Sequence, residues 1–213
     1  NGIAPVPETS PEERAALRES LGLEKNTFVF GILARMEDYK GHLYLVHAAK
    51  LLKDQGRTNF RVLMAGTGSF EEEVARAVVE MGVEDVVQML GFRSEVDQLL
   101  NILDVQLNAS YGTEATSLAL LEGMSLGLPS IVSDYGGNPF LVEHGVNGLV
   151  FPSQDSLALS KCMTRLMDHP NEVKAMGQRA KERFNAQFTG PVFAQNIERI
   201  YLDVRKGDPH GRK

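Results

Sequence analysis

The chain has 213 residues, of which 43% are hydrophobic and 23% charged, a composition typical of a folded globular protein. Its single cysteine, Cys162, excludes an internal disulfide, and no apolar run approaches the ~18 residues of a membrane span. The net charge of −6 argues against nucleic acid as a partner, and without a signal peptide the chain is expected in the cytoplasm.

The first predicted element is a helix over residues 11–21, because Ser10, Pro11 and Glu13 form an N-terminal capping pattern and Gly22 marks the end. Apolar runs then alternate with segments of helical periodicity. The strands are predicted over residues 27–33, 60–65, 86–90, 105–109, 129–133 and 148–151. The later helices are predicted over residues 40–55, 69–81, 94–102 (with Ser94 as N-cap), 116–126, 138–144, 154–168, 171–188 and 191–205.

The alternation of strands and helices indicates parallel pairing, because a parallel connection needs a long return. We therefore expect an α/β fold, a doubly wound, Rossmann-like six-stranded parallel sheet with helices on both faces. Ligands of such sheets bind beyond the carboxyl ends of the strands. The loops that lie there are predicted at residues 34–40, 66–69, 91–94, 108–117 and 133–138.

Two cations, Arg35 and Lys40, occur in the first of these loops. Lys40 is predicted to open a helix, where a cation is disfavoured unless an anion binds nearby. Together with the helix dipole the pair is suited to a diphosphate, although two solvated loop charges are the simpler interpretation.

A glycine turn, Gly66-Thr67-Gly68, follows the second strand. It does not match the dinucleotide pattern G-x-G-x-x-G, because Glu71 stands where the third glycine would be. The turn therefore indicates either close approach of the backbone to a nucleotide or a purely structural bend.

Two acids, Glu114 and Glu122, lie eight positions apart around an apolar helix start. A carboxylate in a largely buried helix needs a partner. An internal salt bridge or a cap is one explanation. The other is a pair of acceptors for ligand hydroxyls, with Glu114 at a sugar and Glu122 at a ribose.

Several other chemistries have no support in the sequence. The five histidines show no metal-ligand spacing, and no Walker motif or D-x-D pair occurs. The stretch Gly123–Gly127 matches the G-x-S-x-G of serine hydrolases, but it falls at a helix end instead of a strand-to-helix elbow.

Taken together, these stretches resemble the C-terminal half of a family 4 (group 1), GT-B-fold retaining glycosyltransferase. The likeness covers nearly the whole chain, and the E-x7-E signature in order with the upstream Arg and Lys is its most specific part. The matching stretches are Gly31–Arg35, Lys40-Gly41, Ala65–Gly68, Leu90–Phe92, Glu114–Gly137 and His144–Phe151.

The resemblance implies a role for each matching residue. Arg35 and Lys40 would hold the donor diphosphate and stabilise the leaving group, and Glu114 would bind the donor sugar. Glu122 would bind the ribose hydroxyls. The other donor-binding residues implied are Gly66 and Gly68, Phe92 and Arg93 in the loop facing the base, and Ala115, Thr116, Ser117 and Leu118 with their backbone amides.

The reaction implied is retaining transfer of a sugar from a UDP-, GDP- or ADP-sugar to an acceptor hydroxyl. It would need no cofactor and no metal, because the two cations replace the metal electrostatically. The sequence departs from the family pattern at Phe140, which stands where an acid is usual, and at Ala115–Ser117, which replaces a glycine-rich start.

The resemblance also implies an N-terminal acceptor domain of the same polypeptide, which would be the route of any peripheral membrane association. We expect residues 1–206 to form a single donor-binding domain, cut at the inter-domain crossover, and residues 207–213 a flexible tail. An apolar stripe on the last helix (Phe193, Ile197, Ile200, Tyr201 and Val204) is then expected to be partly exposed, or covered by a crystal or dimer neighbour. Other interpretations are a nucleotide-sugar epimerase of the same fold, a non-catalytic nucleotide-binding module, and an NAD-type dehydrogenase domain, which the glycine pattern disfavours.

Overall fold

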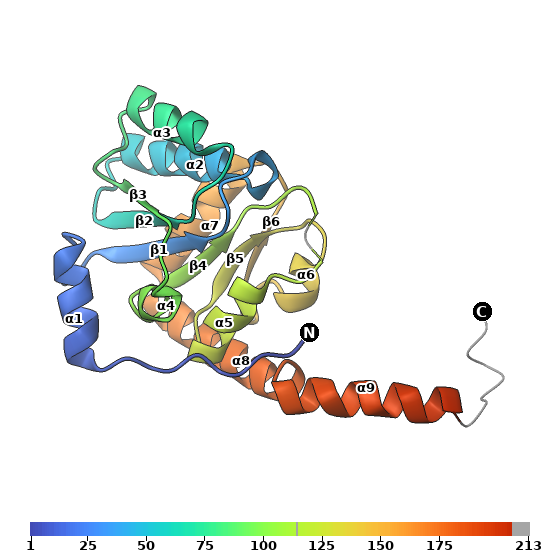
Figure 1. The fold of residues 1–213 in the computed structure, drawn as a ribbon. Coiled ribbons are helices and arrows are strands. Elements are labelled where there is room, and N and C mark those ends of the chain that lie inside the picture. Colours follow the sequence, from blue (N-terminus) through green and yellow to red (C-terminus); the bar gives the residue numbers. More distant parts are fainter. Residues whose placement is uncertain (114, 206–213) are drawn as a thin grey trace.

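A computed structural model describes residues 1–113 and 115–205 of the chain, and it contains a six-stranded parallel sheet (Figure 1). The strand order is β3-β2-β1-β4-β5-β6, so the direction of winding reverses between β1 and β4. This confirms the predicted fold class. The strands are β1 (Phe28–Leu33), β2 (Phe60–Ala65), β3 (Val87–Gly91), β4 (Val105–Asn108), β5 (Ser130–Ser133) and β6 (Gly148–Phe151).

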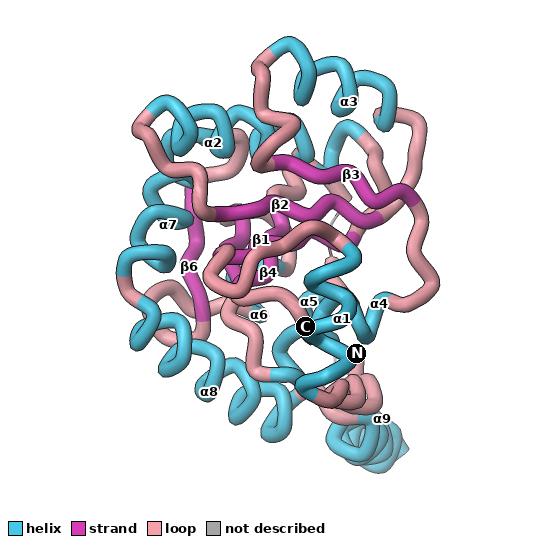
Figure 2. Tube along the Cα trace, turned by 90° about the vertical axis from the view of Figure 1, so that its left-hand side faces the viewer, coloured by secondary structure: helices cyan, strands magenta, loops and turns pink. Residues whose placement is uncertain are grey.

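Helices cover both faces of this sheet. Those packed on one face are α2 (His42–Asp54), α3 (Glu71–Glu80) and α7 (Ser156–Asp168). Those on the other are α1 (Pro11–Ser20), α4 (Val96–Asn101), α5 (Leu118–Leu126) and α6 (Asn138–Leu141). The chain continues as α8 (Pro170–Gln187), which packs beside β6, and α9 (Gly190–Arg205). Figure 2 shows α2, α7 and α8 following one another around the β6 side.

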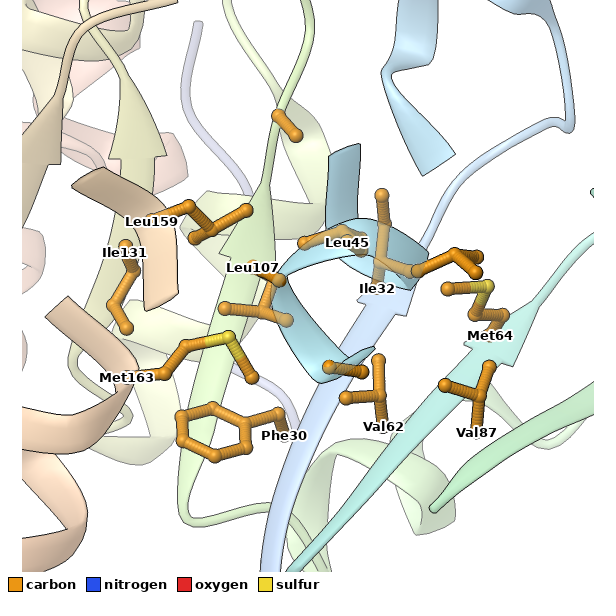
Figure 3. Close-up of a cluster of buried hydrophobic side chains, with 14 of the residues drawn as sticks. Phe30, Ile32, Leu45, Val62, Met64, Val87, Leu107, Ile131, Leu159 and Met163 are labelled. Atoms are coloured by element: carbon orange, nitrogen blue, oxygen red, sulfur yellow. The ribbon is translucent and has the colours of Figure 1, made fainter. Parts of the chain in front are cut away.

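The core on the first face is assembled from alternate residues of the strands. Phe30 and Ile32 of β1 point toward α2 and α7, where Leu45 and Met163 meet them (Figure 3). Val29, between them in sequence, points to the opposite face and joins the cluster under α1 and α4. Because successive strand residues face opposite sides, the continuous apolar runs of the sequence fill both layers.

Helix ends agree with the sequence in some places and differ in others. At α1 both bonds of the capping box form, since Ser10 Oγ accepts from Glu13 N and Glu13 Oε2 accepts from Ser10 N. At α4 the prediction of Ser94 as N-cap is wrong: the helix begins at Val96 after Glu95, and Ser94 donates to the Glu95 carboxylate. The competing side-chain bond leaves that helix without a hydroxyl cap.

The last helix, α9, projects from the body formed by the sheet and the other helices (Figure 1). Its predicted stripe is exposed: Phe193 and Ile197 have 39% and 37% of their surface open, and Tyr201 and Val204 have 72% and 74%. The start of the chain lies at the base of this helix, because Ile3 N donates to Phe188 O and Gly190 N to Ile3 O. Among the described residues, no helix is both long and apolar enough to cross a membrane.

Candidate functional site

Two adjoining cavities lie at the carboxyl edge of the sheet, where the winding reverses. The smaller has a volume of about 200 Å³ and the larger about 520 Å³. Ligands bind beyond this switch point in open α/β sheets. The cavities share Leu33, Ala34, Arg35 and Ala119, so a single elongated ligand could span both.

The smaller cavity brings together the two cations that the sequence singled out. Arg35 is exposed and lines both cavities, and Lys40 lines the smaller one. Arg35 Nη2 donates to the hydroxyl of Tyr39 over 3.1 Å, and Lys40 Nζ lies 5.6 Å from the centre of the Tyr39 ring. Two positively charged residues therefore border a space whose lining also includes the polar residues Asn108, Ser110, Thr116 and Ser117.

Lys40 does not open α2, which corrects the prediction. It ends a short 3-10 turn, Asp38–Lys40, and α2 begins at His42. Between them Gly41 adopts φ +76°, and a Cβ there would lie 2.2 Å from the carbonyl oxygen of Ala109. The glycine thus lets the first loop contact the loop after β4, which places Lys40 beside the α5 end of the site.

The N-terminus of α5 forms the opposite wall of the smaller cavity. Thr116, Ser117 and Leu118 line it, and Ser117 is the N-cap, its Oγ accepting from Leu120 N. The helix therefore starts at Leu118, two residues after the predicted start. Ala115 is exposed and lies outside the cavity lining. The predicted sugar-binding residue Glu114 lies outside the described residues.

The larger cavity contains the second predicted acid. Glu122 of α5 lines it together with Phe92 and Arg93 from the loop after β3. Burial raises the pKa of the Glu122 carboxyl, whereas Phe92 has 76% of its surface exposed. The sequence predicted all three for the donor, and the structure brings them to one cavity that adjoins the two cations.

The glycine turn after β2 has a structural reason. A Cβ at Gly66, whose φ is +141°, would lie 2.0 Å from Ala34 O, and one at Gly68 would lie 2.2 Å from Met36 O. The glycines let this turn pack against the Arg35 loop, and Met36 N donates to Thr67 O across the contact. Gly66 and Thr67 also line the larger cavity, while Gly68 does not.

Beneath the site, a buried polar cluster joins the loops after β4 and β5. Asn138 Nδ2 donates to Ser133 Oγ, Ser133 Oγ donates to Ser110 O, and Ser110 N donates to Asn108 Oδ1. Sequence reasoning marked these loops but missed the cluster. The available signal was the presence of Asn and Ser at the ends of otherwise apolar strands.

The serine-hydrolase pattern at Gly123–Gly127 lies within and just after α5, which agrees with its rejection from the sequence. Gly123 is small for a different reason: a Cβ there would lie 2.0 Å from Gln106 Oε1. Within residues 1–113 and 115–205, no group of three or more His, Cys, Asp or Glu side chains could hold a metal ion.

The family model described as "Glycosyl transferases group 1" matches residues 13–183. Among curated proteins, the putative glycosyltransferase EpsD of Bacillus subtilis is 28% identical over 92% of this chain and 51% of its own length. The putative colanic acid biosynthesis glycosyltransferase WcaL of Salmonella typhimurium is 32% identical over 79% of this chain and 44% of its own. The chain thus spans about half the length of the curated relatives it matches.

Among solved structures, HepE of Anabaena in complex with UDP superposes with a TM-score of 0.84 at 26% identity. The match covers 92% of this chain and 54% of HepE. The C-terminal domain of the Francisella tularensis protein LpcC, at 18% identity and a TM-score of 0.75, matches over 97% of its length and shows the same fold. The architecture is that of one half of a GT-B fold.

Proposed function

Because the chain belongs to the group 1 glycosyl transferases, we propose that it binds a nucleoside-diphosphate sugar across the two adjoining cavities. The observation that carries this proposal is the convergence of Arg35, Lys40 and the α5 N-terminus on one cavity, with Glu122 in the next. The reaction proposed is retaining, metal-independent transfer of the sugar to an acceptor hydroxyl.

The smaller cavity suits the diphosphate. Arg35 and Lys40 supply two positive charges, and the backbone N–H groups at the start of α5 point out of a helix N-terminus. As the bond to the sugar breaks, negative charge develops on the leaving diphosphate, and fixed cations stabilise that charge without a metal ion. Glu114 is proposed to bind the sugar hydroxyls.

The larger cavity suits the nucleoside. The Glu122 carboxylate can accept both ribose hydroxyls, which would compensate for the burial that raises its pKa. Phe92 and Arg93 line the same cavity, and the base is proposed to lie beside them. Support for such a donor comes from HepE, a structural neighbour solved with UDP.

The acceptor half is proposed to be a second domain of the same polypeptide, since the curated relatives are about twice as long. The exposed stripe of α9 is the surface that this domain would cover. We therefore expect the 213-residue chain to bind the donor without turning it over, and the whole enzyme to act in the cytoplasm.

Calorimetric titration with UDP, GDP, ADP and NAD, each with EDTA, tests the proposal. One nucleoside diphosphate should bind, and its affinity should fall in Arg35→Ala but not in Arg76→Ala, which removes an α3 arginine paired with Glu73. Binding of none of the three diphosphates at millimolar ligand and low salt would contradict the proposal. Binding of NAD instead would favour a dehydrogenase domain.

A further inference from the structure

Tyr39 stands between the two cations of the smaller cavity and contacts both. Its hydroxyl accepts a hydrogen bond from Arg35 Nη2 at 3.1 Å. Its ring centre lies 5.6 Å from Lys40 Nζ, within the range of a cation–π contact. We propose that Tyr39 is a positioning residue for the diphosphate site, which holds Arg35 and Lys40 at the spacing that the diphosphate requires. This inference rests on the proposed function.

The groups by which Tyr39 contacts the two cations are uncharged, and this affects how the cations can bind an anion. A carboxylate partner would hold an arginine firmly but would cancel its charge, whereas a phenol oxygen is neutral. Arg35 forms no ion pair with any residue in the described ranges, so its full positive charge stays available to an anion. The contact with Lys40 is also made by an uncharged group, the Tyr39 ring.

Tyr39 is itself fixed from the far side of the site. Its carbonyl oxygen accepts from Tyr111 N at 2.9 Å, and a Cβ on Gly112 would lie 2.8 Å from the Tyr39 Cβ. The Tyr111 ring packs edge-on against Tyr44 at 5.7 Å. Because these contacts come from the loop between β4 and α5, Tyr39 links the cations to the loop that leads into the opposite cavity wall.

The test compares Tyr39→Phe with Tyr44→Phe by calorimetry, using the nucleoside diphosphate that binds the wild-type chain and the matching nucleoside. Tyr44 is the control because its hydroxyl donates to Gln154 instead of contacting Arg35. Tyr39→Phe keeps the ring and the backbone contact and loses only the bond to Arg35. The affinity for the nucleoside diphosphate should fall about fivefold, the value of one hydrogen bond, and the affinity for the nucleoside should not change.

A second arm repeats Tyr39→Phe in an Arg35→Ala background, where the hydroxyl has no guanidinium to hold and should have no effect on binding. An unchanged diphosphate affinity in Tyr39→Phe, an equal loss for the nucleoside, or a loss that persists without Arg35 would each overturn the inference while the proposed function stands. A wild-type chain that binds none of UDP, GDP and ADP would overturn both.

Discussion

Arginine side chains line cavities at both the amino and the carboxyl edge of the sheet, but their hydrogen-bond partners differ. At the amino edge, a cavity of about 650 Å³ contains Arg18 and Asp104. Arg18 donates to three backbone carbonyls, those of Ile102, Glu24 and Thr27, at 3.2, 3.0 and 2.7 Å. At the carboxyl edge, Arg35 donates to the hydroxyl of Tyr39.

The volume of a cavity does not identify the ligand-binding site in this protein. The amino-edge cavity is larger than either cavity at the carboxyl edge, yet its Arg18 donates to the chain's own carbonyls and fixes α1 on the sheet. The carboxyl-edge Arg35 bonds to a neutral hydroxyl, and we propose that its charge serves the ligand. Losing Arg18 should therefore lower stability, whereas losing Arg35 should lower ligand affinity.

The largest expected difference between the two edges is in how the free energy of unfolding depends on pH. His42, buried beside Lys40, has its pKa lowered to about 4 by burial and by that cation. The unfolded chain then binds more protons than the native one between about pH 4 and pH 6.5, so stability falls with falling pH by up to about 3 kcal/mol. Asp104, whose pKa burial raises, has the opposite sign and gains stability with acid.

Urea unfolding at pH 4.5, 5.5 and 7.0 measures this difference. His42→Leu should make the free energy of unfolding depend less on pH. His47→Gln, on the same helix but exposed, should leave this pH profile unchanged. Asp104→Asn should make it steeper, because it removes the opposing contribution. A His42→Leu profile parallel to the wild type would contradict the assignment.

Arg18→Ala should have the next largest effect, a loss of about 2–3 kcal/mol in the free energy of unfolding, because three carbonyls lose a charged donor. Nucleoside diphosphate affinity should not change. The neighbouring Arg14→Ala, which lines the same cavity, is the control for charge alone. Equal losses in the two variants would show that charge, and not the three bonds, stabilises this edge.

Arg35→Ala should give the reverse pattern. The affinity for the nucleoside diphosphate should fall by about 2 kcal/mol, the value of a hydrogen bond from a charged group, with unfolding changed by no more than about 0.5 kcal/mol. Adding Lys40→Ala should lower the affinity for the diphosphate further and leave the affinity for the nucleoside unchanged. A destabilisation as large as that of Arg18→Ala would erase the distinction between the edges.

Glu122→Gln should have the smallest effect. It should lower ligand affinity without lowering the stability of the fold. The amide cannot accept the ribose hydroxyls as well, so affinity should fall by about 1 kcal/mol. Because burial disfavours the charged carboxylate, the variant should be at least as stable as the wild type at pH 7.5. Calorimetry and thermal melts measure the two quantities, and a drop in melting temperature would assign Glu122 a structural role.

Much of the fold followed from sequence because apolar runs such as Phe28–Leu33 and Val62–Ala65 are too continuous for a half-exposed strand. Parallel strands also bring the ends of distant segments to one edge, which is why Arg35 and Glu122 could be assigned to one site. The start of α2 was misplaced because Gly41 is required by a contact with Ala109, 68 positions away by residue number.

The role of Tyr39 could not be found in this way, because it depends on where one side chain lies relative to two others. No periodicity or motif encodes that placement. The same holds for Asn138, whose bonds to Ser133 and toward Asn108 exist only once β4 and β5 are paired. Sequence patterns located the loops, and tertiary packing determined which side chains meet.

The contact between Gly123 and Gln106 constrains how this protein can vary. Gln106 Nε2 donates to Ala119 O at 2.7 Å, and its other amide atom occupies the space that a side chain at position 123 would need. A larger residue at position 123 is therefore compatible only with a shorter one at position 106. We expect the two positions to covary in an alignment of related sequences, with glycine at 123 accompanying a long polar side chain at 106.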